Sequence, residues 1–380
     1  MRVEGNVGAP LGPDRLVAAA GLAPGDPTTL RADAKRALKD RPVDGQAYRL
    51  LAQVADAEGN PAQAERLYRV AIKRDPREWV AQMMLTDTAL SAGAAGEAVE
   101  HLDAALRVAP FIGSDVLTAF LPHLSDAAIR DAMAAVLASN PPWAGSLMTA
   151  LRDPTVQADH VEALMATLSR LRPLNETERS VRIEALVRLG RPREARAVWF
   201  QSLGQSERRA SSDLYNGGFE AAEQAEGRFS WRWSSQPGMD IAVDRTNPHS
   251  GSQALRIDFS GRPVELKGPE QWVALEAGIY TLSAWTYDTT DTTRPFLWKL
   301  SCASGTQLAT IELSTVKPPK WSQDQARFEV PPNCPMQRLV LSHASRSMEE
   351  RRLGGSLLID DIVVRKVPLA SAGSSAIRTQ

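Results

Sequence analysis

Several features that would quickly assign this sequence to a class are missing from it. Only two of its 380 residues are cysteines, Cys302 and Cys334, which excludes a four-cysteine metal site. The 44 basic and 45 acidic residues leave a net charge of -1, so the chain has no overall basic footprint for nucleic acid. The five histidines are scattered, and no metalloprotease, nucleophile-elbow or phosphate-loop motif occurs. We therefore expect a non-catalytic protein.

Long apolar runs are also missing. No stretch of about 18 consecutive apolar residues predicts a membrane span. The first residues, MRVEGNVGAPLGPD, lack the charged start and apolar stretch of a signal peptide. We expect no membrane span and, for the chain as written, a cytoplasmic location. A mis-assigned start would instead allow the periplasm or the cell envelope.

Pro42, Pro76 and Pro110 are evenly spaced along the chain, and their fixed interval indicates a helical repeat. Small and aromatic residues recur between them at helical spacing and predict antiparallel helix pairs; in the first clear unit these are Tyr48, Leu51, Ala52, Ala55, Ala64, Tyr68 and Ala71. Gly59, Asn60 and Pro61 form the intervening turn. Further helices are expected at 127–138, 144–151, 160–171 and 176–189, and a last hairpin runs to Trp199.

This pattern resembles the tetratricopeptide repeat family. The resemblance implies an α-solenoid over residues 14–205 with a groove that holds a protein or peptide. The alternative is an array that acts as a spacer or a dimerising surface. A polar stretch, 204–212, is the expected linker.

Beyond residue 212 the apolar period changes from helical to alternating. Short β-branched and aromatic runs predict strands at 229–233, 253–259, 271–275, 279–287, 296–302, 307–313, 326–330, 337–342 and 356–366. Many short strands without helices between them predict an antiparallel β-sandwich over residues 213–367. The fold class is thus multidomain α + β, with a disordered tail at 368–380.

Short motifs in this half resemble the jelly-roll carbohydrate-binding modules. They are Asn216-Gly-Gly-Phe-Glu220, His249-Ser-Gly251, Gly278 to Trp285, Trp321 and Ile359-Asp-Asp-Ile362. The resemblance implies a jelly roll that binds a polysaccharide or glycan.

Alternation along 279–287 puts Tyr280, Leu282 and Ala284 on one face of the strand, and Trp285 and Tyr287 on the other. A flat ring can stack against the C–H groups of a pyranose, so Trp285 and Tyr287 are predicted sugar-binding residues, and Trp272 could join them. The alternative for each ring is packing beneath a loop.

The same resemblance implies a structural calcium ion, held by Glu220, Asp360 and Asp361, because oxygen ligands suit a hard cation. A metal-free role at the strand end is the alternative.

The two cysteines allow two interpretations. A disulfide between Cys302 and Cys334 would close a loop of 31 intervening residues. It would stabilise the fold by roughly 3–4 kcal/mol and would need an oxidising compartment. The alternative is two buried free thiols.

These expectations combine into an adaptor whose sandwich binds a glycan and whose repeats recruit a protein, as in a bacterial envelope or exopolysaccharide system. The rival hypothesis is a protein scaffold whose sandwich does not bind sugar. Exposed rings at Trp285 and Tyr287 would favour the adaptor.

Overall fold

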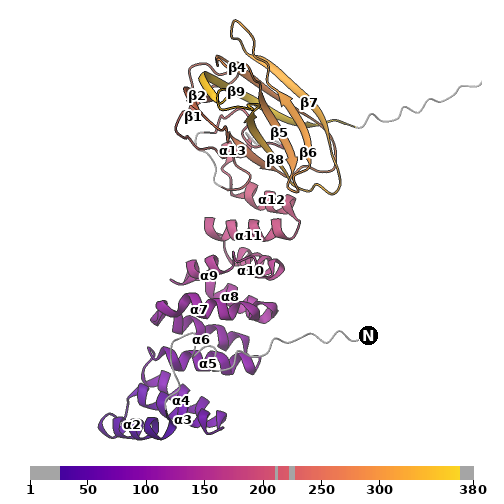
Figure 1. The fold of residues 1–380 in the computed structure, drawn as a ribbon. Coiled ribbons are helices and arrows are strands. Elements are labelled where there is room, and N and C mark those ends of the chain that lie inside the picture. Colours follow the sequence, from indigo (N-terminus) through magenta and orange to yellow (C-terminus); the bar gives the residue numbers. More distant parts are fainter. Residues whose placement is uncertain (1–25, 210–212, 222–226, 369–380) are drawn as a thin grey trace, which may run out of the picture. The chain divides into compact units, whose positions relative to one another are not determined.

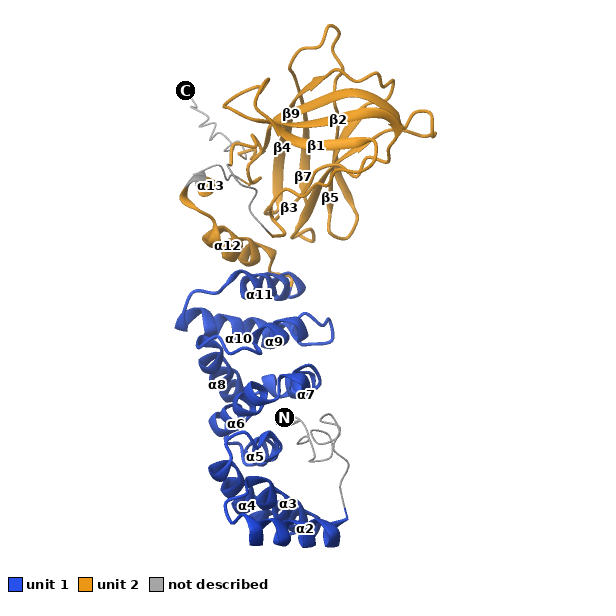
Figure 2. Cartoon of the chain, turned by 90° about the vertical axis from the view of Figure 1, so that its left-hand side faces the viewer, with its two compact units in different colours: residues 1–189 blue, residues 190–380 orange. Residues whose placement is uncertain are grey.

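The computed structural model describes residues 26–209, 213–221 and 227–368, and it divides the chain into two compact units, 1–189 and 190–380 (Figure 2). The described part of the first unit is helical, and the second carries two antiparallel sheets (Figure 1). Residues 14–25 of the predicted helical domain and 369–380 of the predicted tail lie outside the described residues.

The helices of the first unit keep a fixed period over its first half. α2 (Pro27–Asp40), α4 (Pro61–Arg74) and α6 (Ala95–Val108) begin at equal intervals, and so do α3 (Gly45–Ala57), α5 (Trp79–Ser91) and α7 (Gly113–Phe120). The period is then lost in α8 (Ala127–Ala138), α9 (Ala144–Ala150), α10 (Ala158–Leu171) and α11 (Glu176–Arg188), with 3-10 turns at Pro110–Ile112 and Leu121–Ser125. The helices predicted after residue 126 are confirmed.

Local chemistry sets where these helices begin. The side chains of Asp26, Asp44 and Asn60 each accept a hydrogen bond from the backbone N–H three residues on, which satisfies donors that a helix start leaves free. Pro27 and Pro61 follow two of these caps and have no N–H to satisfy. These helix starts therefore depend on residues close together in the chain.

Each early helix packs against its chain neighbours, α2 on α3, α3 on α4, α4 on α5 and α5 on α6. Beyond that point α6 packs on α8, α8 on α10 and α10 on α11. Ala52, Ala64 and Ala71 are at most 1% exposed, which allows the close approach of α3 and α4. Tyr68 is also buried, and its hydroxyl donates to Asp56 at 2.8 Å.

The division at residue 189 assigns the last predicted hairpin helix, α12 (Pro192–Ser202), to the β unit, although the sequence pattern continues the helical domain to 205. α12 packs on aromatic residues of that unit: the Trp199 ring lies 5.0 Å from that of Tyr215 and 5.9 Å from that of Phe229. Part of the expected linker is also a short helix, α13 (Gln205–Arg209), and 210–212 lie outside the described residues.

The β unit is a sandwich of two antiparallel sheets. One has the strand order β1-β2-β9-β4-β7 and the other β3-β8-β5-β6. The strands are β1 (Met239–Asp244), β2 (Ala254–Pro263), β3 (Glu270–Val273), β4 (Gly278–Asp288), β5 (Phe296–Cys302), β6 (Gln307–Glu312), β7 (Ser322–Val330), β8 (Gln337–His343) and β9 (Arg352–Lys366).

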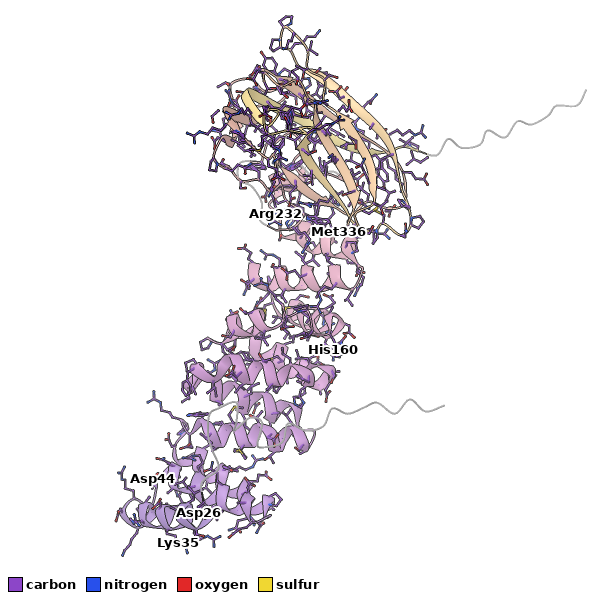
Figure 3. All side chains as sticks on the ribbon, viewed as in Figure 1. Asp26, Lys35, Asp44, His160, Arg232 and Met336 are labelled. Carbon is purple, nitrogen blue, oxygen red and sulfur yellow. A yellow bond between two sulfur atoms is a disulfide. The ribbon has the colours of Figure 1, made fainter. Side chains whose placement is uncertain are left out.

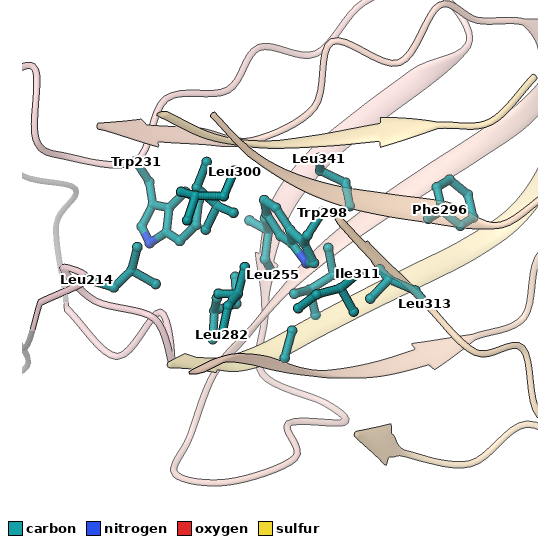
Figure 4. Close-up of a cluster of buried hydrophobic side chains, with 14 of the residues drawn as sticks. Leu214, Trp231, Leu255, Leu282, Phe296, Trp298, Leu300, Ile311, Leu313 and Leu341 are labelled. Carbon is teal, nitrogen blue, oxygen red and sulfur yellow. The ribbon is translucent and has the colours of Figure 1, made fainter. Parts of the chain in front are cut away.

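The core lies between the sheets, where Leu282 of β4 and Trp298 and Leu300 of β5 are fully buried (Figure 4). Trp231 joins this core and donates its indole N–H to the carbonyl of Asn216. Cys302 and Cys334 form a disulfide with a Cα–Cα distance of 5.5 Å. The bond ties the end of β5 to the loop before β8.

One predicted strand is absent from the structure, and one observed strand was not predicted. Residues 229–233 form no strand, because Trp231 is drawn into the core and only Arg232 makes an isolated bridge, to Glu270. β1 was not predicted: it is a short edge strand, and Val243, at 40% exposed, breaks the apolar alternation that marks a half-buried strand.

Candidate functional site on the five-stranded sheet

The outward face of β4 carries the two predicted ring residues. Leu282 and Ala284 point into the core with no exposed surface, whereas Trp285 and Tyr287 lie on the opposite face and are half-buried. The predicted division of this strand into an apolar and a polar-aromatic face is therefore confirmed.

Polar side chains surround these rings on the neighbouring strands. In the register of the sheet, Gln323 of β7 and Asp360 of β9 stand opposite Trp285 on either side. Gln323 is exposed, and Asp360 is fully buried. The ring of Trp321, just before β7, lies 5.9 Å from that of Tyr287. The face thus combines flat apolar rings with hydrogen-bonding groups.

A histidine covers one ring. His249, from the loop between β1 and β2, stacks on Trp285 with 3.8 Å between ring centroids and 17° between planes. It also meets Trp321 edge-on at 5.5 Å. One face of the predicted sugar platform is therefore occupied by the protein's own side chain.

A bulge in β9 positions the two aspartates beneath this histidine. The register with β4 shifts between Ser283 and Trp285, and Asp361 has a φ of 44°, in the left-handed region. Asp360 accepts hydrogen bonds from the backbone N–H of His249 at 2.9 Å and of Ser250 at 3.1 Å. Asp361 lies 2.7 Å from Nδ1 of His249. The two carboxylates hold the histidine loop against the sheet.

Burial raises the pKa of Asp360 to about 6, because the charged carboxylate loses contact with water and the nearby Asp361 adds repulsion. Hydrogen bonds from the loop oppose this change without cancelling it. Among the described residues, no arginine or lysine forms an ion pair with Asp360. The position therefore retains negative charge that a cation could balance.

Glu220 belongs to the same region. It accepts hydrogen bonds from the backbone N–H of Ser252 at 2.7 Å and of Gln253 at 2.9 Å. Burial raises its pKa, but these hydrogen bonds outweigh burial, and the pKa of Glu220 is lowered overall. Glu220, Asp360 and Asp361 thus all anchor the loop that carries His249.

Two glycines of the predicted motif bring these carboxylates together. A Cβ on Gly217 would lie 1.9 Å from the carbonyl oxygen of Ile362, so only glycine lets the 216–220 segment pair with β9. A Cβ on Gly218 would lie 3.4 Å from Oδ1 of Asp361 and 3.6 Å from Oδ1 of Asp360. Carboxylate oxygens of Asp360 and Asp361 therefore lie beside Gly218, and such oxygens suit a hard cation.

Trp272 is not part of this site. It lies on β3, in the other sheet, where its ring is flanked by Arg228 and Arg338. The expectation that it could join Trp285 and Tyr287 on one platform is wrong, because β3 and β4 belong to opposite sheets. His249 and Trp321, not Trp272, lie beside Trp285 and Tyr287. In the sequence, the one signal for their role is that both belong to the motifs shared with carbohydrate-binding modules.

No protein-family model matches the chain, and a search of the curated proteins finds no match. Among the described residues, no single helix is long and apolar enough to cross a membrane; only α6 joined to Pro110–Ser125, across a bend of 112°, has the length and composition.

Solved structures similar to the chain include carbohydrate-binding modules. A family 61 module in complex with β-1,4-galactotriose is 20% identical, with a TM-score of 0.30, over 41% of this chain and 99% of the module. The C-terminal family 22 module of Clostridium thermocellum Xyn10B is 16% identical, with a TM-score of 0.29, over 41% and 95%. The xylan-binding domain of Paenibacillus barcinonensis Xyn10C is 16% identical, with a TM-score of 0.27, over 37% and 87%. TM-scores this low assign the chain neither a ligand nor a binding residue.

Proposed function

We propose that this protein is a non-catalytic adaptor that binds a polysaccharide or glycan on the outward face of its five-stranded sheet and a protein partner through its helices. The observation that carries the glycan half is the cluster of Trp285, Tyr287 and Trp321 on one solvent-facing surface. A bacterial envelope or exopolysaccharide system would use such an adaptor.

The chemistry of the cluster supports a sugar ligand. Sugar rings present C–H groups to flat aromatic surfaces, and adjacent polar groups such as Gln323 and Gln325 bind their hydroxyls. The indole N–H of Trp321 is buried and has no acceptor among the described residues. A buried donor without a partner costs about 1–3 kcal/mol, so a small rearrangement that brings a sugar oxygen to it is favoured.

The strand order also supports a module of this kind. Without β1, the two sheets read β2-β9-β4-β7 and β3-β8-β5-β6, the pairing of two four-stranded sheets expected of a jelly roll. Such sandwiches hold ligands on the sheet face rather than in the filled interior. The core of this one is occupied by Trp231 and Trp298.

The experiment is binding of the full-length chain to a panel of soluble neutral polysaccharides, beside the variants Trp285→Ala and Tyr287→Ala. Each variant is expected to lose at least about tenfold in affinity, which corresponds to about 1.4 kcal/mol. Trp272→Ala, which removes a ring from the opposite sheet, is the matched control and should bind normally. Unchanged binding in the Trp285 variant would remove this face from the proposal.

A specific observation favours the rival scaffold function. His249 covers one face of Trp285. In the scaffold function, Trp285 holds the loop that carries His249 in place and binds no sugar. Absence of binding to every glycan, with and without calcium, would select the scaffold.

We also propose that Glu220, Asp360 and Asp361 hold a structural calcium ion. The ion would balance three carboxylates that have no arginine or lysine partner among the described residues. Thermal unfolding tests this: calcium should raise the melting temperature of the wild type and not that of Glu220→Gln. An equal rise in both proteins would contradict the assignment.

The proposal that the helices bind a protein partner is based on the regular interval between helix starts. This interval supports a tetratricopeptide-type solenoid over the helical unit. Such arrays offer an extended surface to peptides. The measurement is crosslinking of the full chain to its partner in native cells, compared with the variant Phe111→Ala, which removes a side chain of the helical unit that is 75% exposed. A partner retained equally by both would place the contact elsewhere.

A further inference from the structure

A second surface lies on the outward face of the four-stranded sheet and has a different character. Residues opposite one another in an antiparallel sheet share a face. One row across this sheet contains Arg232, Glu270, Val340 and Lys299. The next contains Trp272, Arg338 and Ser301. Basic side chains and a tryptophan therefore lie side by side.

The first row borders a hollow of about 420 Å³. Its lining includes Arg232, Trp233, Lys267, Glu270 and Arg338. Figure 3 labels Arg232 on the sandwich. Ligand sites of about 300–1,000 Å³ are typical for small molecules, so the hollow suits one or two sugar rings.

The hollow has an excess of positive charge. Glu270 is the one acid in its lining, and it is already paired with Arg338, whose Nε donates to it at 2.9 Å. Arg232 and Lys267 are exposed and have no acidic partner within 4.0 Å in the described part of the chain. Two cationic groups are thus free to meet an anion beside the half-buried ring of Trp233.

The second row reinforces this charge. The guanidinium carbons of Arg228 and Arg338 each lie 5.8 Å from the centre of the Trp272 ring. Such stacking holds the arginine side chains in place. Arg338 already donates to Glu270, whereas Arg228 has no acidic partner within 4.0 Å among the described residues and keeps its N–H groups available. Together with Lys299, they extend the basic surface beyond the hollow.

We propose that this hollow binds the carboxylate of a uronic acid residue in an acidic polysaccharide, with Arg232 and Lys267 on the carboxylate and Trp233 against the sugar ring. Arginine recognises a planar carboxylate through two parallel hydrogen bonds. A nucleic acid is less well matched, since it needs a long basic track and the chain as a whole carries a charge of -1.

This inference extends the glycan half of the proposed function but uses a separate sheet. The probes are short oligogalacturonates and their methyl esters, which have the same ring without the charge, titrated into the full-length chain. The wild type should bind the acid at least about tenfold more tightly than the ester. Its affinity for the acid should fall as salt rises from about 0.05 M to about 0.5 M.

The decisive variant is Arg232→Ala with Lys267→Ala, both at exposed positions where the fold should persist, as circular dichroism would verify. It should lose at least about tenfold in affinity for the acid. Arg327→Ala, which removes an exposed arginine from β7 on the other sheet, is the matched control and should bind the acid normally.

Several outcomes would overturn the inference: equal affinity for acid and ester, unchanged binding in the double variant, no binding of the acid, or tighter binding of a single-stranded oligonucleotide. Trp285→Ala separates the two sites, because it should lose neutral glycans and keep oligogalacturonate. Failure of one proposal therefore leaves the other intact.

Discussion

The two outward faces of the sandwich differ, although one core supports both. On the five-stranded sheet, a loop held by carboxylates presses His249 onto Trp285, and the site is acidic and partly covered. On the four-stranded sheet, Trp272 and Arg232 lie on an open basic surface. Strand alternation decides which residues face outward, but the loops and the register decide what chemistry each face offers.

The largest expected effect on stability comes from a change in the core between the two sheets, which supports both outward faces. Trp298→Ala deletes a fully buried ring between the sheets and should lower the free energy of unfolding by about 3–5 kcal/mol. Urea unfolding measures this, with Trp272→Ala, whose ring is only half-buried, as the control. Equal losses in the two variants would mean that the sheets do not share this core.

Reduction of the disulfide tests whether the four-stranded sheet depends on a covalent tie. Breaking the Cys302–Cys334 bond frees a loop of 31 intervening residues and should cost roughly 3–4 kcal/mol in loop entropy. Thermal unfolding of Cys302→Ser with Cys334→Ser should show the loss, while glycan binding at Trp285 is retained. A double variant as stable as the wild type would contradict this.

The acidic face should respond to pH. The pKa of Asp360 is raised to about 6, so between pH 4 and 6 the folded state binds more protons than the unfolded state. Its contribution to stability is therefore present below pH 4 and lost as pH rises through 6, by at most about 3 kcal/mol.

Chemical unfolding of the wild type and Asp360→Asn at pH 4 and pH 7, without calcium, measures this difference. The wild type should lose stability relative to the variant at the higher pH, and calcium should restore it. A difference that does not change with pH would show that Asp360 is not desolvated.

The smallest expected effect is a change in glycan affinity when His249, which stacks on Trp285, is removed. His249→Ala removes the stacked ring, whose displacement by a sugar costs about 0.5–1.5 kcal/mol, so affinity for a neutral glycan should rise about twofold to twelvefold. Isothermal titration measures it, with oligogalacturonate as the ligand that should not change. Weaker neutral binding would instead make His249 a sugar contact.

Much of the architecture was predictable because it depends on local patterns. The helix starts follow from capping residues such as Asp44 and Asn60, and β5 was predicted with the bounds it has in the structure. Two strands were not predicted correctly. β1 is an edge strand with an exposed valine, and residues 229–233 form no strand because Trp231 packs in the core.

The candidate site was predicted only in part. Trp285 and Tyr287 were placed on the correct face because alternation has a fixed period of two. His249, distant from Trp285 in the chain, could not be placed over that ring, since the contact depends on hydrogen bonds from its loop to Asp360 and Asp361. Trp272 was misplaced because sequence does not say which sheet a strand joins.

By itself, the sequence determined the helical and β halves, the period of the helices and the inward and outward faces of the strands, since each follows from the spacing of neighbouring side chains. Only the tertiary structure decided that Trp272 and Trp285 lie on opposite sheets, that Cys302 meets Cys334, and that a basic hollow forms beside Arg232. Those contacts join residues distant in the chain, and strand order and register, which bring them together, are set by the packing of the whole core.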